Sequence, residues 1–234
     1  MKNLLILLAA STCFISCASV SGNGDVREES RNISDIHSVK SSGSIDVEIK
    51  SGNTYALVVE NDENLLQYVI TDVDNGVLNI HYKNGYSIMN DHAKVTVTAP
   101  SLDKLISSGS ADIKSDGVIN SSNEITVSTS GSGDINLQLD APSIEATSSG
   151  SGDISLSGRT KDFQCKVSGS GDIKCANLKS ENASIRVSGS SDVHVFASVN
   201  LKVNVSGSGD VYYGGNPTSP EIHIAGSGTV QAQQ

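Results

Sequence analysis

The feature that most constrains the fold is a hexapeptide, Ser-Gly-Ser-x-Asp-Ile/Val, which occurs six times between residues 108 and 211. Successive copies lie 18 to 22 residues apart, and a degenerate copy follows at residues 226–230. A period of about 19 residues is typical of a solenoid, in which each repeat packs only on its neighbours. The aspartates of the six copies are Asp112, Asp134, Asp153, Asp172, Asp192 and Asp210.

Apolar and polar residues alternate on both sides of each glycine-containing turn. With the Asp as position zero, position +1 is always Ile or Val, and position −7 is also apolar in every copy. This period of two predicts two short strands of about five residues in each repeat, stacked in parallel and in register on the next repeat. The predicted fold class is therefore all-β, a parallel β-helix or β-solenoid, right-handed as parallel crossovers generally are. The residues at −7 are Leu105, Val127, Ala146, Cys165, Ile185, Val203 and Ile222.

The composition alone would suggest an unfolded, flexible chain. Of 234 residues 22 are Gly, only 4% are aromatic and none is Trp, yet 37% are hydrophobic and occupy fixed positions in the repeat. We expect the turn glycines to supply positive φ angles and the Asp carboxylates to be hydrogen-bonded locally or hydrated. The net charge of −10 and the pI of about 4.8 argue against nucleic acid as a partner.

The N-terminus carries a secretion signal. Residues 1–16 contain Lys2 and an apolar core, too short for a permanent membrane span. The segment Phe14-Ile15-Ser16-Cys17 resembles the lipobox of bacterial lipoproteins, which implies a lipid on Cys17; a plain signal peptide cleaved at residues 18–21 is the alternative. Residues 17–32 lack an apolar period and predict a flexible tether. We therefore expect an outer-membrane lipoprotein on the cell surface or the periplasmic face.

The remaining chain divides into two parts. Residues 33–105 are less periodic and predict a β-rich N-terminal cap, with a short helix at residues 62–68 and a tight turn at Asp74-Asn75-Gly76. Residues 106–234 hold the regular repeats. A cap at one end of the solenoid would protect its edge strands.

Few residues in the chain point to chemistry. Cys165 and Cys175 occupy core positions of one repeat, where a disulfide is possible in a secreted protein. The five His are scattered without metal-ligand spacing, and one Asp per 19-residue repeat fits a calcium-binding nonapeptide solenoid poorly. Ser and Asp are too numerous to identify one nucleophile and its base. We expect no catalytic residues, no metal and no cofactor.

Outward positions of adjacent repeats suggest a binding surface. Positions −6, −8 and +2 place several cations close together on an otherwise acidic chain, and one Tyr could offer a stacking surface. An ordinary solvated sheet surface is the alternative interpretation. The candidate ligand-binding residues are Lys166, Lys174, Arg186, Lys202 and Tyr212.

Several motifs together resemble a known family. They are the lipobox, the segment at residues 36–49, Asn64-Leu65-Leu66 and the serial Ser-Gly-Ser-Gly-Asp turns. Over residues 33–232 they are similar to the "putative auto-transporter adhesin, head GIN domain" family, which is common in Bacteroidetes. The resemblance implies a β-helix-like domain and a non-enzymatic cell-surface adhesin. We expect its partner to be an extended glycan or host matrix. A structural envelope lipoprotein and, less favoured, a carbohydrate-active β-helix enzyme are the alternatives.

Overall fold

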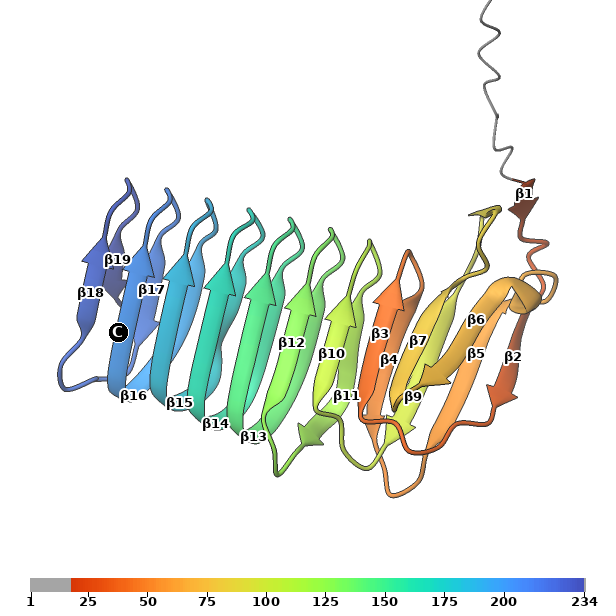
Figure 1. Ribbon diagram of the computed structural model, residues 1–234, viewed down its shortest axis with the longest axis horizontal. Coiled ribbons are helices and arrows are strands. Elements are labelled where there is room, and N and C mark those ends of the chain that lie inside the picture. The colour runs from red at the N-terminus through yellow and green to blue at the C-terminus, as the bar shows by residue number, and fades with distance from the viewer. Residues whose placement is uncertain (1–17, 234) are drawn as a thin grey trace, which may run out of the picture.

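The structure, a computed structural model, describes residues 18–233 and shows a β-solenoid with two flat walls (Figure 1). The repeated turns line one edge of the solenoid, and bends or loops line the opposite edge. The less regular part contains β1 (Ala18–Ser21), β2 (Val26–Arg31), β3 (Ser38–Ser42), β4 (Asp46–Ser51), β5 (Ala56–Asp62), a 3-10 helix (Leu66–Tyr68), β6 (Val69–Asp74), β7 (Val77–Tyr82), β8 (Tyr86–Met89), β9 (Lys94–Ala99) and β10 (Lys104–Ser107). The regular part contains β11 (Ile113–Asn120), β12 (Ile125–Thr129), β13 (Ile135–Ser148), β14 (Ile154–Val167), β15 (Ile173–Val187), β16 (Val193–Val205), β17 (Val211–Gly214), β18 (Glu221–Ile224) and β19 (Val230–Ala232).

Strand pairing assigns the strands to the two walls. The first wall contains β6, β7, β3, β10, β12 and β18 together with the C-terminal parts of β13–β16. The second wall contains β2, β5, β9, β4, β11, β17 and β19 together with the N-terminal parts of β13–β16. β1 and β8 form a separate two-stranded sheet.

The predicted register is confirmed. Ile135 pairs with Ile154 and Ala146 with Cys165, so equivalent positions of successive turns lie on one another in parallel strands. The expectation of two short strands per repeat is wrong for the middle turns, where β13–β16 are single strands of 13 to 15 residues. Backbone pairing continues around much of the bend between the walls, so one strand crosses from one wall to the other.

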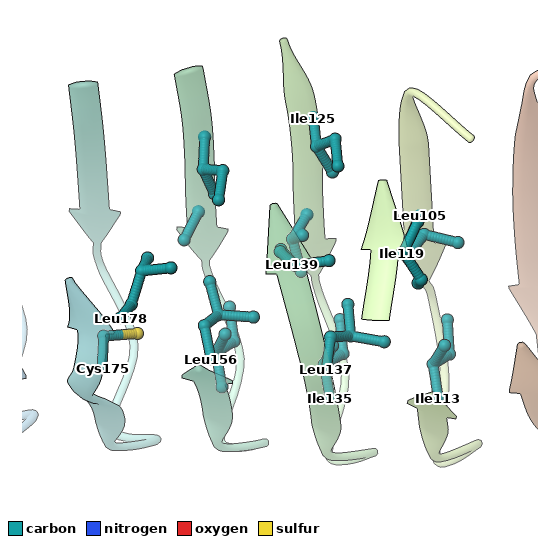
Figure 2. Close-up of a cluster of buried hydrophobic side chains, with 14 of the residues drawn as sticks. Leu105, Ile113, Ile119, Ile125, Ile135, Leu137, Leu139, Leu156, Cys175 and Leu178 are labelled. Carbon is teal, nitrogen blue, oxygen red and sulfur yellow. The ribbon is translucent and has the colours of Figure 1, made fainter. Parts of the chain in front are cut away.

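The inward positions of both walls form one continuous core. Figure 2 shows part of it, with Ile113, Ile135, Leu137, Leu156 and Cys175 stacked from turn to turn. These five side chains are at most 2% exposed. Burying an aliphatic side chain of this size contributes about 1.5–3 kcal/mol, which explains why a chain with few aromatic residues forms a stable core.

The turn glycines have a different role from the one expected. The glycine three residues before each Asp has no positive φ from Gly109 onward, and Gly43 in the first turn is the exception at 113°. A Cβ at these later positions would lie 1.8–2.2 Å from the carbonyl oxygen of the equivalent glycine one turn earlier. Glycine is needed because the turns stack backbone on backbone. These glycines are Gly109, Gly131, Gly150, Gly169, Gly189, Gly207 and Gly226.

The aspartates are hydrogen-bonded as expected, but these bonds join successive turns and are not local to one turn. Asp134 Oδ1 accepts the backbone N–H of Asp153 at 2.8 Å, and Asp153 Oδ1 accepts that of Asp172 at 2.8 Å. At the end of the ladder, the backbone N–H and hydroxyl of Thr229 hold the pKa of the Asp210 carboxyl below its usual value. Each Asp therefore ties its own turn to the next one.

Replacing Asp134 by Ala is expected to lower the free energy of unfolding by about 1 kcal/mol, because the N–H of Asp153 loses its charged acceptor. Asp134→Asn keeps an oxygen at the same place and should cost less than half of that. Urea unfolding followed by circular dichroism measures both changes. Asn136→Ala, an outward substitution in the same turn, serves as the control. Equal losses for Asp134→Ala and Asn136→Ala would show that the ladder does not stabilise the stack.

The N-terminal part differs from the predictions at residues 17–32 and 62–68 and agrees with them at residues 74–76. The tether predicted at residues 17–32 is wrong for the described residues 18–31, because β1 pairs with β8 and β2 pairs antiparallel with β5. Arg31 fixes β2 by donating to the backbone carbonyls of Val69 and Leu66 at 2.7 and 2.9 Å. The helix expected at residues 62–68 is a single 3-10 turn. The turn at residues 74–76 joins the antiparallel pair β6 and β7, as expected.

Candidate functional site

The candidate site lies on the outer surface of the first wall. Strand alternation sends positions −9, −7 and −5 into the core and positions −10, −8 and −6 outward. Parallel register stacks the outward residues of successive turns into three polar rows, with one residue of each row per turn. In the middle three turns these rows are Asp162, Asn182 and Asn200; Gln164, Ser184 and Lys202; and Lys166, Arg186 and Asn204.

Side-chain amides hold the row at −10 in a fixed geometry. Asn182 Nδ2 donates to Asp162 Oδ1 at 2.7 Å, and Asn200 Nδ2 donates to Asn182 Oδ1 at 2.7 Å. Asn182 thus uses one donor and one acceptor within the ladder, and Asn200 uses one donor. The remaining N–H and lone pairs of these exposed or half-exposed groups are available to a ligand.

A shallow groove of about 500 Å³ runs between the rows at −10 and −8. It crosses six consecutive turns, from Glu124 to Glu221, and is lined mainly by hydroxyl, amide and carboxylate groups. We call this surface the polar groove. It is lined by Glu124, Ser143, Asp162, Phe163, Gln164, Asn182, Ala183, Ser184, Asn200, Leu201, Lys202, Ser219 and Glu221. A groove of this shape fits an extended ligand that runs along the solenoid axis.

The structure brings together three of the five predicted ligand-binding residues. Lys166 and Arg186 are neighbours in the row at −6, and Lys202 lies one turn further in the row at −8. Lys166 pairs with Glu145 at 2.6 Å and Lys202 with Glu221 at 2.9 Å. Arg186 has no carboxylate within 4.0 Å among residues 18–233. Of these three cations, Arg186 is therefore the one whose charge is not already paired.

The other two predicted residues lie on the opposite wall, so the expectation of one continuous strip is wrong. Position +2 belongs to the second wall, and Lys174 and Tyr212 project from it, away from the polar groove. Lys174 pairs with Asp153 at 2.5 Å, and the ring of Tyr212 stacks on His194 with centroids 4.8 Å apart. Positions −6 and +2 are both outward in an alternating pattern, but alternation does not tell which wall a position faces.

Sequence reasoning missed a second depression at the bend between the walls. It measures about 420 Å³, and Lys179 Nζ lies 4.2 Å from the centre of the Phe196 ring at its edge. Arg159 pairs there with Asp140 of the preceding turn. The bend varies in length and composition from repeat to repeat, so no periodic signal marks it.

Cys165 and Cys175 are core residues. Both thiols are free and fully buried, so the structure does not contain the possible disulfide. Burial raises the pKa of the Cys175 thiol to about 12, and it raises that of Cys165 as well. A thiol with a raised pKa is a poor nucleophile, in agreement with a packing role.

Two further arrangements of His and carboxylate side chains bear on possible chemistry. Over residues 18–233, no group of three or more His, Cys, Asp or Glu side chains is placed to hold a metal ion. The buried carboxylate of Asp62 accepts a hydrogen bond from Gly24 and contacts His92 Nδ1 at 2.9 Å. The Asp62 carboxylate thereby holds the segments that contain Gly24 and His92 against the end of β5.

The predicted membrane attachment involves the N-terminal segment. Cys17, the predicted lipid attachment residue, and the predicted signal peptide lie outside the described residues. Within the described part of the chain, no helix has the length and apolar character needed to cross a bilayer.

Comparison with known proteins agrees with the fold. A family model described as "putative auto-transporter adhesin, head GIN domain" matches residues 35–217. A crystal structure of a putative adhesin from Bacteroides fragilis is 18% identical with a TM-score of 0.87, covering 92% of this chain and all of that one.

Two structures from Parabacteroides distasonis are also similar. One is a putative lipid binding protein, 26% identical with a TM-score of 0.74, and the other a putative adhesin, 27% identical with a TM-score of 0.69. In both comparisons 92% of this chain and all of the other chain are covered. A search of the curated proteins gave no match.

Proposed function

The chain belongs to the family described as "putative auto-transporter adhesin, head GIN domain", and from this premise we propose that it binds an extended glycan in the polar groove. The observation that carries the proposal is the repetition of the same kinds of polar group along the groove, once per turn. Neighbouring strands lie about 4.8 Å apart, so hydrogen-bonding groups recur at that interval over six turns. A polymer with regularly spaced hydroxyl groups can pair with many of them at once.

The rigidity of the groove supports binding. Its central residues, from Ser143 to Lys202, project from strands that are paired on both sides, and the Asp162–Asn182–Asn200 ladder already fixes two of its amides. Pre-ordered side chains lose little conformational entropy when a ligand binds, so several individually weak hydrogen bonds can add up to useful affinity. Repeated weak contacts suit adhesion to a long polymer.

The cations near the groove point to a ligand that carries some negative charge. Arg186 is exposed and has no carboxylate partner in the described part of the chain, while Lys166 and Lys202 are held by Glu145 and Glu221. A guanidinium binds a carboxylate or sulfate through two parallel hydrogen bonds. We therefore include acidic and sulfated matrix glycans among the candidate ligands.

Two other functions compete with this proposal. A structural envelope lipoprotein would keep the solenoid but need no ligand. A carbohydrate-active enzyme would need a carboxylate free to act on a bound sugar, and Asp162, near the middle of the groove, is engaged by Asn182. Turnover of a polysaccharide that one groove substitution abolishes would favour the enzyme.

Filling the groove tests the binding proposal. Ser184 is exposed and lies near the middle of the groove, so Ser184→Trp is expected to reduce retention on a bound glycan or matrix component at least tenfold. Retention is measured on an array of glycans and matrix components. Binding to lipid vesicles is measured in a parallel experiment. Asn136→Trp places the same bulky ring at an exposed position of the second wall and serves as the matched control. Equal binding by both variants would place any ligand elsewhere, and failure of the wild type to bind would favour the structural alternative.

We further propose that the protein is anchored by a lipid on Cys17 and exposed on the outer membrane. Membership of an adhesin family supports a cell-surface location. Protease treatment of intact cells is expected to remove the protein while a periplasmic control survives. Protection from the protease would put the solenoid in the periplasm and argue against adhesion. Labelling with a palmitate analogue, abolished by Cys17→Ala, tests the anchor separately.

A further inference from the structure

The two ends of the solenoid differ in how their edges are protected. At the N-terminal end the edge strands are β2 in the second wall and β6 in the first wall (Figure 1). Both strands are rich in charged residues, which oppose pairing with another strand. The charged residues of these two strands are Arg27, Glu28, Glu29, Arg31, Asp72 and Asp74.

Within residues 18–233, the last strands at the C-terminal end carry less of this protection. Among the described residues, β18 pairs only with β16 and β19 pairs only with β17. Ile222 and Ile224 occupy inward positions but are 37% and 46% exposed, whereas Val203 and Val205, one turn earlier, are 0% and 2% exposed. The apolar rows of the core thus continue to an open edge, where backbone N–H and C=O groups are also unpaired.

We propose that two copies of this chain associate tail to tail, with β18 of each copy pairing antiparallel. The charged N-terminal edges oppose a head-to-tail stack. The open end of one copy would therefore pair with the open end of a second copy. A two-fold axis normal to the walls would bring both β18 and β19 next to their counterparts. Pairing would complete the backbone hydrogen bonds and cover the exposed Ile side chains.

Hydrogen-bond complementarity selects the register of this pairing, because a ring N–H of His223 can donate to a carboxylate. Residues directly opposite each other in an antiparallel pair point to the same side of the sheet. With Ile222 opposite its own copy, the outward Glu221 lies across from the partner's His223, and this opposite pair occurs twice by symmetry. The same register packs the two Ile222 side chains together in the shared core.

The dimer would present its binding surfaces on one side. A two-fold axis normal to the walls keeps the first wall of both copies on the same face, so both polar grooves would face the same way. Two sites that can reach one polymer together bind it more strongly than either alone. This consequence rests on the proposed function, whereas the dimer itself does not.

Sedimentation equilibrium of the purified protein over a range of concentrations tests the proposal, and the wild type is expected to show a monomer–dimer equilibrium. His223→Glu places two carboxylates opposite each other twice and is expected to raise the dimer dissociation constant about tenfold. The double variant Glu221→His with His223→Glu restores opposite pairs and should recover most of the affinity. Ile222→Lys should abolish the dimer.

Asn204→Glu is the matched control, because it adds the same charge to the same row one turn inside the end, where the strand is paired on both sides. It should leave the dissociation constant within about twofold. A wild type that is monomeric at every concentration reached would overturn the proposal. So would equal effects of Asn204→Glu and His223→Glu, or a double variant no better than His223→Glu. Circular dichroism confirms that each variant is folded.

Discussion

Replacing Gly169 by Ala is expected to destabilise the protein by about 3 kcal/mol or more. The added Cβ would lie 1.8 Å from the carbonyl oxygen of Gly150 in the preceding turn. The clash is with backbone, which cannot rotate away as a side chain does. The same carbonyl accepts the N–H of Ser170 at 3.0 Å, so relief requires the two turns to separate and break hydrogen bonds between them. Chemical unfolding followed by circular dichroism measures the loss.

Ser170→Ala is the matched control for this change. Ser170 lies next to Gly169 in the same turn, is exposed and already carries a Cβ, so the replacement adds no atom to the stack. We expect it to change the free energy of unfolding by less than about 0.5 kcal/mol. A loss for Gly169→Ala as small as that for Ser170→Ala would show that backbone stacking does not explain the glycine of the Ser-Gly-Ser turn.

Replacing Ile185 by Ala is expected to lower the free energy of unfolding by about 2–5 kcal/mol, the usual cost of removing a fully buried Ile. Ile185 is completely buried in the −7 row, between Cys165 and Val203 of the neighbouring turns. The paired walls cannot collapse onto the cavity without disturbing the register of several strands. Denaturant unfolding at low protein concentration provides the measurement.

Ile222→Ala removes the same atoms from the same row at the open end. Because Ile222 is 37% exposed, its replacement should cost less than about 1 kcal/mol in the dilute monomer. If the proposed dimer forms, this cost should grow as the protein concentration rises. A loss for Ile185→Ala no larger than that for Ile222→Ala would contradict the view that stacking between turns provides most of the stability.

The regular half of the fold could be predicted because every repeat contains the same information. Each repeat has a β-branched residue after the Asp and an apolar residue at −7. Both must stack on their counterparts in the next turn, so the period and the alternation together predict the parallel register. The N-terminal part was harder, since β2 pairs with β5 about thirty residues away and has no apolar pattern of its own. Its assignment as a tether failed because hydrogen bonds to the backbone require no particular side chains.

The candidate site shows the same division. Lys166, Arg186 and Lys202 share a wall because their repeats are in register, which a repeat alignment indicates. Lys174 and Tyr212 were grouped with them wrongly, because alternation separates inside from outside but not one wall from the other. The polar groove was not predicted. Its row at −10 lies next to the bend, where the repeat is least regular.

The amino-acid sequence by itself determined the all-β class, the period and the inward rows, because each depends on contacts between identical positions of neighbouring repeats. Only the tertiary structure decided which outward rows face the same side, where the groove lies, why glycine is required in the turn, and which end of the solenoid is open. These features depend on how the chain bends between walls and on how closely the backbones stack. Both arise from packing in three dimensions, which the pattern of apolar and polar residues along the chain does not describe.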